Sequence, residues 1–257
     1  MSQSGIEAVT AALLRARRSN SLVDAAPLAD ALADAGEAYA VQQQVAQALG
    51  WFAADGAPRF WKSGGPGREQ PLTHAPLPPA GVWSSPAELS RWPMNLRLVE
   101  SEIALRLGRD VDPALAATLD FDDAYGLVDA MAVSIELVDS RWQQGLAAPA
   151  LLRLADLASH AALVLGEWQP CAPCDWAAQR CRLAIGAQPL VERTGTHSCG
   201  DPAWVLADWL RHATSRHGTL RAGTVVTTGT WAGAPAAAAG DTVVLKFPGI
   251  GQASTHF

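Results

Sequence analysis

Two glutamates stand inside an otherwise apolar run near the middle of the chain. Residues 99–108 read Val-Glu-Ser-Glu-Ile-Ala-Leu-Arg-Leu-Gly, and this mixture of β-branched and apolar residues predicts a β-strand. Side chains two apart in a strand point to the same face, so we expect Glu100 and Glu102 to lie side by side. Adjacent carboxylates repel each other, and a hard divalent cation such as Mg²⁺ or Mn²⁺ would neutralise them. The alternative is an edge strand that exposes both acids to water.

A third glutamate lies in a second apolar run. Residues 131–142 read Met-Ala-Val-Ser-Ile-Glu-Leu-Val-Asp-Ser-Arg-Trp and also predict a strand, in which an unpaired Glu136 is unfavourable. Glu136 follows Glu102 by 34 residues, enough chain for a return crossing that brings the three acids around one octahedral ion. A pairing of Glu136 with Arg141 or another base is the alternative, and spacing leaves both open. Asp139 and Arg141 share one alternation and predict a structural ion pair.

Composition narrows the classes of protein to consider. Hydrophobic residues make up 49% of the 257 residues and charged residues 17%, which suits one large domain, or one domain with a small appendage, and argues against disorder. The net charge is −6 with no basic run, which disfavours nucleic-acid binding. No apolar stretch reaches the roughly 18 residues of a membrane span, and the N-terminus lacks the apolar core of a secretory signal, so we expect a cytoplasmic location.

The four cysteines give a weak signal. Cys171 and Cys174 form a Cys-x-x-Cys pair, which can hold zinc or cycle as a dithiol. Cys181 and Cys199 do not supply a second pair at zinc-site spacing, and no thioredoxin-like context surrounds the first. We therefore expect reduced, unpaired thiols, with a redox dithiol as the alternative.

Apolar periodicity predicts helices near the N-terminus and short strands through the rest of the chain. The predicted helical segments are residues 5–19, a stretch from Pro27, 37–49 with a stop at Gly50, part of 110–124, and 202–217 behind Asp201. The further predicted strands lie within 58–67, 161–165, a hairpin over 180–193, 224–230 and a final strand at 242–247. Residues 66–93, with seven prolines, predict an extended loop.

These elements indicate an α+β fold. Many short strands with a few helices imply a mixed, largely antiparallel β-core and not a doubly wound sheet. We expect an N-terminal helical segment over residues 1–55 and a second domain over residues 56–257.

Five stretches in a fixed order carry a family resemblance. They are VESEIALRLGRDV, AVSIELVDSRW, LADLASHAALVLGEW, TLRAGTVVTTGTWAG and AGDTVVLKFPGIG. Together with Ala-Tyr-Ala-Val-Gln at 38–42, they resemble the fumarylacetoacetate hydrolase superfamily, and within it the 2-keto-4-pentenoate hydratase and 2-oxo-3-hexenedioate decarboxylase branch. The resemblance covers nearly the whole chain. It implies a fumarylacetoacetate hydrolase-like fold, a catalytic domain over 56–257, and Mg²⁺ or Mn²⁺ held by Glu100, Glu102 and Glu136.

The resemblance also implies roles for other residues. Lys62 matches the lysine of the family's Tyr/Trp-Lys-x-Gly motif and would hold charge or move a proton near the ion; a surface lysine is the alternative. Thr228, Gly229 and Thr230 are implied to bind a substrate carboxylate. Ser159 is implied to border the substrate pocket.

A histidine follows Ser159 directly. We expect His160 to act as a proton shuttle, with a hydrogen-bonded packing histidine as the alternative. The family's segment here reads closer to Ala-Asp-Asn-x-Ser, and Leu157 stands in place of the Asn.

The Pro-rich loop departs from the family pattern. Hydratase relatives have a longer loop that supplies an Asp near the site, whereas no Asp lies between Lys62 and Glu100 in this chain. His74, Glu69 or Glu88 would have to replace it, or the chemistry differs.

The resemblance implies a metal-dependent enzyme that acts on 2-oxo or 2-hydroxy-dienoic acids through an enolate. Hydration of a 2-hydroxypenta-2,4-dienoate-like substrate is favoured, and hydrolysis of an acylpyruvate-type C–C bond and decarboxylation are the alternatives. A binding protein that keeps the fold without turnover is a further alternative, although three acids in apolar strands without a role would be costly. The expected partners are a small 2-oxo acid and further copies of this chain, as a homodimer or higher homo-oligomer.

Overall fold

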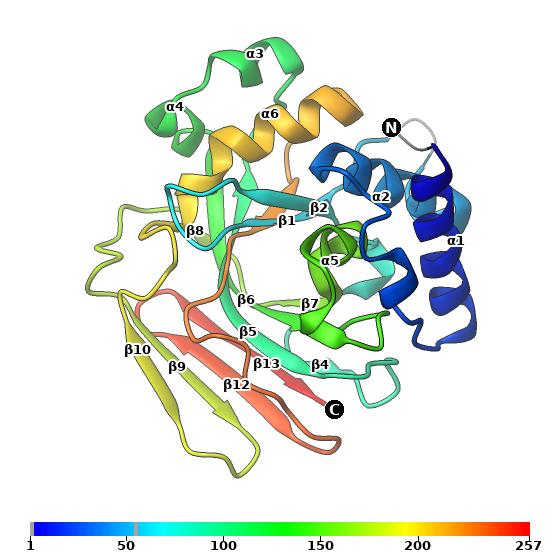
Figure 1. Ribbon diagram of the computed structural model, residues 1–257. Coiled ribbons are helices and arrows are strands. Elements are labelled where there is room, and N and C mark those ends of the chain that lie inside the picture. The colour runs from blue at the N-terminus through cyan, green and yellow to red at the C-terminus, as the bar shows by residue number, and fades with distance from the viewer. Residues whose placement is uncertain (1–2, 54–55) are drawn as a thin grey trace.

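The computed structural model describes residues 3–53 and 56–257, and it shows two β-sheets with helices at the top and on one side of the molecule (Figure 1). The helices are α1 (Gln3–Ser19), α2 (Ala35–Leu49), α3 (Pro113–Thr118), α4 (Phe121–Tyr125), α5 (Ala150–Ala155) and α6 (Leu206–His217). The pair α1 and α2 lies on one side of the molecule, while α3, α4 and α6 gather at the top of the view (Figure 1).

The two N-terminal helices end at the predicted residues, Ser19 and Leu49, and each begins two residues earlier than predicted. The side chain of Asp34 accepts a hydrogen bond from the N–H of Glu37 at the start of α2, and Gly50 ends that helix in the left-handed conformation with φ 63°. The helix predicted from Pro27 is wrong, since one 3₁₀ turn, Ala26–Leu28, forms there. The Glu37 carboxylate accepts a hydrogen bond from the N–H of Ala33, while the Asp34 side chain accepts one from the N–H of Glu37. These two bonds begin α2 as a separate helix after the 3₁₀ turn.

The larger sheet carries the glutamate-bearing strands. Its hydrogen-bonded order is β2-β1-β11-β5-β6-β7-β3, and β8 also pairs with β6. The strands are β1 (Phe60–Gly64), β2 (Thr73–Pro76), β3 (Val82–Ser84), β5 (Leu98–Leu107), β6 (Val128–Val138), β7 (His160–Leu165), β8 (Gln169–Pro170) and β11 (Val225–Thr227). The strand predicted over 131–142 therefore begins earlier and ends at Val138.

The smaller sheet packs against the first, and all its strands except β4 come from the C-terminal part of the chain. Its order is β10-β9-β12-β13-β4, with β4 (Ala87–Glu88), β9 (Arg180–Ile185), β10 (Val191–Thr194), β12 (Thr242–Phe247) and β13 (Gly251–His256). The predicted hairpin over 180–193 forms as β9 and β10. The prediction that 242–247 is the last strand is wrong, because β13 follows it and pairs with it antiparallel.

The Pro-rich segment 66–93 is also more ordered than an extended loop. It contains β2, β3 and β4, which lie at sheet edges, where a proline without an N–H is tolerated. Most strand pairs of the described chain are antiparallel, while β1–β11, β3–β7 and β4–β13 are parallel. The predicted α+β class with a mixed, largely antiparallel core is confirmed.

The two sheets pack against each other through β13 and β6. The largest core cluster joins apolar residues of both sheets, among them Ile103, Ile135 and Leu245. Gly166 marks the close approach of the sheets, because a Cβ placed there would lie 2.4 Å from the carbonyl oxygen of Gln252.

A second core cluster lies under the N-terminal helices. It combines residues of α1 and α2, such as Leu13 and Val41, with Trp142 and Leu152 from the chain around α5. The helical segment is therefore packed onto the part of the chain that follows β6. No helix among the described residues is long and apolar enough to cross a membrane.

Candidate active site

The three glutamates converge because β5 and β6 pair antiparallel. The register places Glu100 opposite Glu136 and Glu102 opposite Ser134, and cross-strand partners share one face of a sheet. One carboxylate oxygen from each glutamate lies within 4.8 Å of the others. Glu102 is 2% exposed and Glu136 is fully buried, so these two acids are not exposed to water at the edge of a sheet.

Lys62 reaches the same cluster from β1. The register runs from Lys62 to Thr227 of β11 and on to Ala104 of β5, which puts the lysine on the glutamate face. Its Nζ donates to Oε1 of Glu136 at 2.5 Å and to the carbonyl oxygen of Ala158 at 3.2 Å. The base that pairs with Glu136 is thus Lys62 and not Arg141.

His160 lies at the start of β7, beside Glu136. Its Nδ1 is 3.0 Å from Oε1 of Glu136, and the side chain is 2% exposed. Burial lowers the pKa of His160 and outweighs the opposing effect of the Glu136 carboxylate. A neutral ring donates its Nδ1 hydrogen to Glu136, which leaves a lone pair on Nε2.

Two buried atoms of this cluster lack a partner among the described residues. They are Oε2 of Glu136 and Nε2 of His160. Buried polar atoms are normally hydrogen-bonded, and exceptions call for an explanation such as an ion, water or ligand. The cluster therefore has bonding capacity that the protein itself does not use.

The charges of the cluster do not balance. Burial raises the pKa of Glu100 to about 7. Burial and the charges of Glu136 and Glu100 raise the pKa of Glu102 to about 8. Burial also opposes ionisation of Glu136, but the Lys62 ammonium and the hydrogen bond from His160 keep its pKa below the ordinary value.

The lysine responds in the opposite way. Burial disfavours the ammonium of Lys62, but the attraction of Glu136, Glu100 and Glu102 raises its pKa overall. One cation therefore faces three carboxyl groups, and a further cation at the cluster would favour the ionised forms of Glu100 and Glu102.

Two hydroxyl residues next to Glu102 were not predicted from the sequence. Thr227 Oγ1 donates a hydrogen bond to Oε2 of Glu102, and it lies 2.9 Å from Oγ of Ser134. All three side chains are buried. The alternation of side chains in a strand predicts the place of Ser134, because this residue lies two residues before Glu136 and so shares its face.

The turn at Thr228–Thr230 uses its two hydroxyl groups within the protein. The hydroxyl of Thr228 donates to the carbonyl of Ile103 at 2.8 Å, and that of Thr230 donates to the carbonyl of Gly233 at 2.7 Å. The N–H groups of Gly229 and Thr230 donate to no other described residue. These two N–H groups are thus free for a ligand, while the carbonyl of Thr228 bonds to Nε2 of His197 at 2.8 Å and the hydroxyl hydrogens of the turn are in use.

Ser159 lies next to the cluster in an unusual turn. Leu157, Ala158 and Ser159 have φ values of 54°, 50° and 64°, so three successive non-glycine residues are left-handed. Such residues cost on the order of 1–3 kcal/mol each and persist only where their surroundings hold them. The turn brings the carbonyl of Ala158 to Lys62 and the ring of His160 to Glu136.

The residues proposed to replace the loop Asp do not reach the cluster. His74 lies on the other side of β1, with Nδ1 2.9 Å from Oγ of Ser63. Glu69 is exposed, and Glu88 is exposed on β4 in the smaller sheet. Among the described residues, the acids that gather at the cluster are Glu100, Glu102 and Glu136.

Two further sequence interpretations concern residues outside the cluster. The predicted ion pair between Asp139 and Arg141 is a long contact of 3.9 Å, and Arg141 binds Asp156 instead at 2.8 Å. Cys171 and Cys174 are free thiols, as are the two remaining cysteines.

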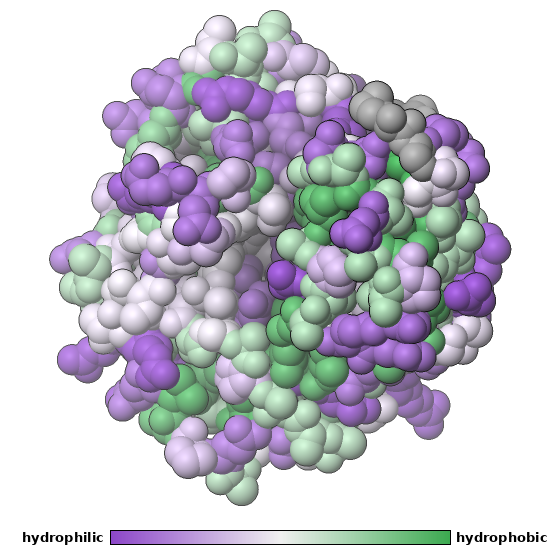
Figure 2. All heavy atoms as spheres, viewed as in Figure 1, coloured by the Kyte–Doolittle hydropathy of each residue, from purple (hydrophilic) through white to green (hydrophobic). Residues whose placement is uncertain are grey.

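The surface opens near the glutamate-bearing strands. The space-filling view is hollowed near its middle, where the ribbon view shows β5 and β6 (Figures 1 and 2). One rim of the hollow is neutral to hydrophilic, and the other mixes hydrophobic with hydrophilic residues (Figure 2). This combination suits a small molecule with polar and apolar parts.

The fold and this cluster define a class of protein. Residues 52–257 match the family described as fumarylacetoacetate (FAA) hydrolase C-terminal, and the chain belongs to this family of enzymes, which confirms the superfamily predicted from sequence. No curated protein matches the chain significantly.

Several solved structures are similar in fold. A 4-oxalocrotonate decarboxylase from Pseudomonas putida G7, complexed with magnesium and adipate, has a TM-score of 0.83 at 17% identity and covers 100% of this chain and 98% of its own. A 2-hydroxyhepta-2,4-diene-1,7-dioate isomerase from Mycobacterium marinum has a TM-score of 0.55 at 17% identity, covering 78% and 74%. A fumarylpyruvate hydrolase from Pseudomonas aeruginosa, in complex with Mn²⁺ and pyruvate, has a TM-score of 0.52 at 15% identity, covering 78% and 89%.

Proposed function

We propose that the chain is a divalent-metal-dependent enzyme of 2-oxo acids, with Glu100, Glu102 and Glu136 as the ligands of Mg²⁺ or Mn²⁺. The observation that carries the proposal is the buried carboxylate cluster, in which Oε2 of Glu136 has no partner among the described residues. The donor set is all oxygen, and its three carboxylates together would carry more negative charge than Lys62 offsets, which fits a hard divalent cation. The magnesium and manganese in two structures of similar fold support the same choice.

The bound ion would supply positive charge beside the 2-oxo and carboxylate oxygens of a substrate and so favour an enolate. The chain's own groups have complementary tasks. Lys62 holds Glu136 in place with its ammonium, and the free N–H groups of Gly229 and Thr230 bind a substrate carboxylate. His160 carries a proton through its unpartnered Nε2.

Decarboxylation of an unsaturated 2-oxo diacid is the reaction we place first. The C–CO₂ bond breaks, its electron pair moves through the conjugated double bond to the 2-oxo oxygen, and CO₂ leaves. This step needs an electron sink but no base that activates water, in keeping with the absence of a loop acid among the described residues near the cluster. The similarity of the whole chain to a decarboxylase supports this order.

Hydration is the second candidate, and it is the reaction that the sequence resemblance favours. The observation in its favour is the neutral ring of His160, whose free Nε2 can accept a proton from water. The two reactions give different products from related substrates.

A substrate panel tests the proposal. The purified chain is mixed with Mg²⁺ or Mn²⁺ and with 2-oxo and 2,4-dioxo acids, and enol absorbance and product mass are followed. Loss of CO₂ supports decarboxylation, gain of water supports hydration, and a split carbon chain supports C–C hydrolysis. Calorimetry should show metal binding that Glu102→Gln weakens and that Glu192→Gln, at an exposed acid of the β9–β10 hairpin, leaves unchanged. Absence of metal binding would remove the basis of the proposal.

A further inference from the structure

The left-handed turn at residues 157–159 needs an external support. It fixes two groups of the site. The carbonyl of Ala158 accepts a hydrogen bond from Lys62, and His160, the first residue after the turn, contacts Glu136. Three left-handed non-glycine residues in a row do not hold this shape by themselves. The contacts that hold the turn therefore set the geometry of the site.

Backbone hydrogen bonds hold the turn at both ends. The N–H of Ser159 donates to the carbonyl of Asp156 at 3.0 Å, and the carbonyl of Ser159 accepts from the N–H of Asp139 at 2.9 Å. The carbonyl of His160 accepts from Nη2 of Arg141 at 2.8 Å. The guanidinium of Arg141 thus ties the end of the turn to the segment after β6.

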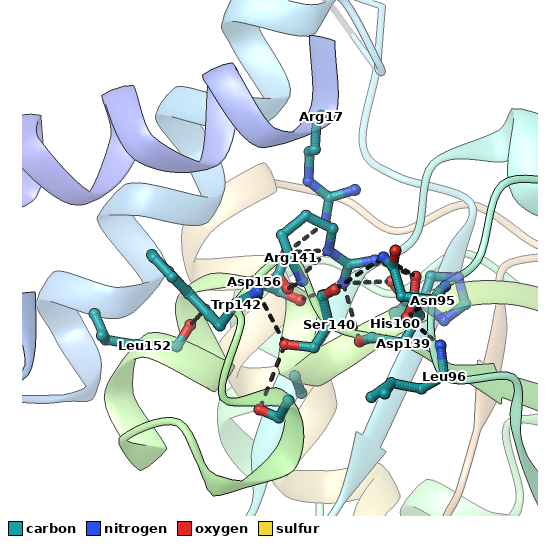
Figure 3. Close-up of polar contacts among 12 residues, drawn as sticks. Arg17, Asn95, Leu96, Asp139, Ser140, Arg141, Trp142, Leu152, Asp156 and His160 are labelled. Atoms are coloured by element: carbon teal, nitrogen blue, oxygen red, sulfur yellow. Dashed lines mark hydrogen bonds and ion pairs between the residues drawn. The ribbon is translucent and has the colours of Figure 1, made fainter. Parts of the chain in front are cut away.

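Asp156 in turn fixes Arg141 (Figure 3). Its carboxylate is fully buried and accepts from Nε of Arg141 at 2.8 Å and from the backbone N–H of Arg141 at 3.0 Å. A buried carboxylate with charged donors makes strong, directional bonds. Asp156 is therefore the centre of the support.

The third member comes from the N-terminal helix. Nη2 of Arg17, near the end of α1, donates to Oδ1 of Asp156 at 2.8 Å (Figure 3). Arg15 and Arg18 of the same helix are exposed. Arg17 lies outside residues 52–257, the part that matches the family. Helix α1 thus contributes a charged side chain to the contacts of Asp156 from outside the part of the chain that matches the family.

We propose that Arg17, Asp156 and Arg141 form a positioning network through which helix α1 holds the turn that presents Ala158 and His160 to the carboxylate site. The inference rests on the proposed function for its catalytic consequence. Its structural consequence, the rigidity of residues 157–160, is independent of any substrate.

The test compares Arg17→Gln with Arg18→Gln, which removes a charge from the neighbouring exposed position. Hydrogen exchange followed by mass spectrometry should show residues 157–160 exchanging about tenfold faster in Arg17→Gln, because the opening of a local segment becomes easier. The metal affinity and KM should stay within about twofold of wild type, while kcat falls about tenfold, the scale of supporting contacts around a metal site. Arg17→Lys, which keeps a charged donor, should restore most of both losses, and Arg18→Gln should match wild type.

Two outcomes would overturn the network. One is exchange at 157–160 that Arg17→Gln leaves unchanged. The other is exchange that rises equally in β5, which would show general destabilisation. Asp156→Asn is the stronger variant, and Arg17→Gln keeps the test valid if that variant does not fold. If no substrate of the panel reacts, the proposed function fails, but the exchange result still decides the network.

Discussion

Two adjacent residues of β1 lead into two polar clusters on opposite faces of the sheet. Lys62 faces Glu136 and His160. Ser63 faces His74, whose Nδ1 is 2.9 Å from its hydroxyl. Each cluster joins a histidine and an acid to a residue of the same strand, yet their bonding differs.

The second cluster uses its histidine completely. Nδ1 of His74 bonds to Ser63, Nε2 lies 3.4 Å from Oδ2 of Asp208, and the ring packs 4.6 Å from that of His212. In the first cluster, Nε2 of His160 and one oxygen of its acid lack partners among the described residues. The same residue types thus have all their bonding capacity used in one cluster and part of it unused in the other, and the unused part is the reason to propose a ligand at the first.

The largest effect should follow from Glu136→Gln. This change removes a proposed ligand charge and leaves the Lys62 ammonium without an ionised partner, with only neutral oxygens as acceptors. A metal ion contributes several kcal/mol to stabilising charge in a transition state, so we expect turnover to fall about 1000-fold and calorimetry to show weakened Mg²⁺ binding. Asp208→Asn is the matched change in the second cluster and should leave both quantities unchanged. Equal losses in the two variants would break the comparison.

His160→Asn should have the next largest effect. The Asn amide can still donate toward Glu136 near the position of Nδ1, but it has no acceptor at the position of Nε2. We expect kcat to fall about 100-fold, the usual scale for loss of a proton-transfer group, with metal affinity nearly unchanged. Unchanged turnover would make His160 a packing residue.

The sequence could predict the convergence of the acids because it depends on one simple rule. Alternation in a strand puts Glu100 and Glu102 on one face. A second apolar strand follows after enough residues for the chain to turn back, which favours antiparallel pairing. The family order of the motifs then predicted the fold. The N-terminal helices were predictable for the same reason, since their apolar spacing and caps are local.

Other features depend on contacts between distant parts of the chain. The left-handed turn at 157–159 contains no glycine, so its sequence does not predict it. The contact of Arg17 with Asp156 joins residues 139 positions apart in the chain. The side of β1 on which His74 lies follows from the β1–β2 register, which a Pro-rich segment does not reveal. β13 was missed because its sequence, Gly-Gln-Ala-Ser-Thr-His, lacks an apolar run.

Glu102→Gln should separate stability from function. In the metal-free protein the pKa of Glu102 is raised to about 8 from an ordinary 4.5, so folding disfavours its ionised form. This penalty is absent below about pH 4.5 and grows as the pH rises towards 8. In chelator at pH 7 we expect the variant to be roughly 3 kcal/mol more stable than wild type by urea unfolding, although it binds metal weakly. The gain should shrink as the pH falls to 4.5, and a gain that does not depend on pH would contradict the assigned cause.

His74→Phe should have the smallest effect. Unlike Glu102→Gln, it should lower the stability of the fold and leave metal binding unchanged. Phenylalanine keeps the ring that packs beside Tyr39 and His212, but it leaves the buried hydroxyl of Ser63 without its partner. An unmet buried hydroxyl costs about 1–2 kcal/mol, which urea unfolding measures directly. Metal affinity and kcat should stay as in wild type, because Ser63 and Lys62 point to opposite faces of β1. Adding Ser63→Ala removes the unmet hydroxyl and should recover most of the loss, so a double variant no more stable than His74→Phe would show that the cost comes from elsewhere.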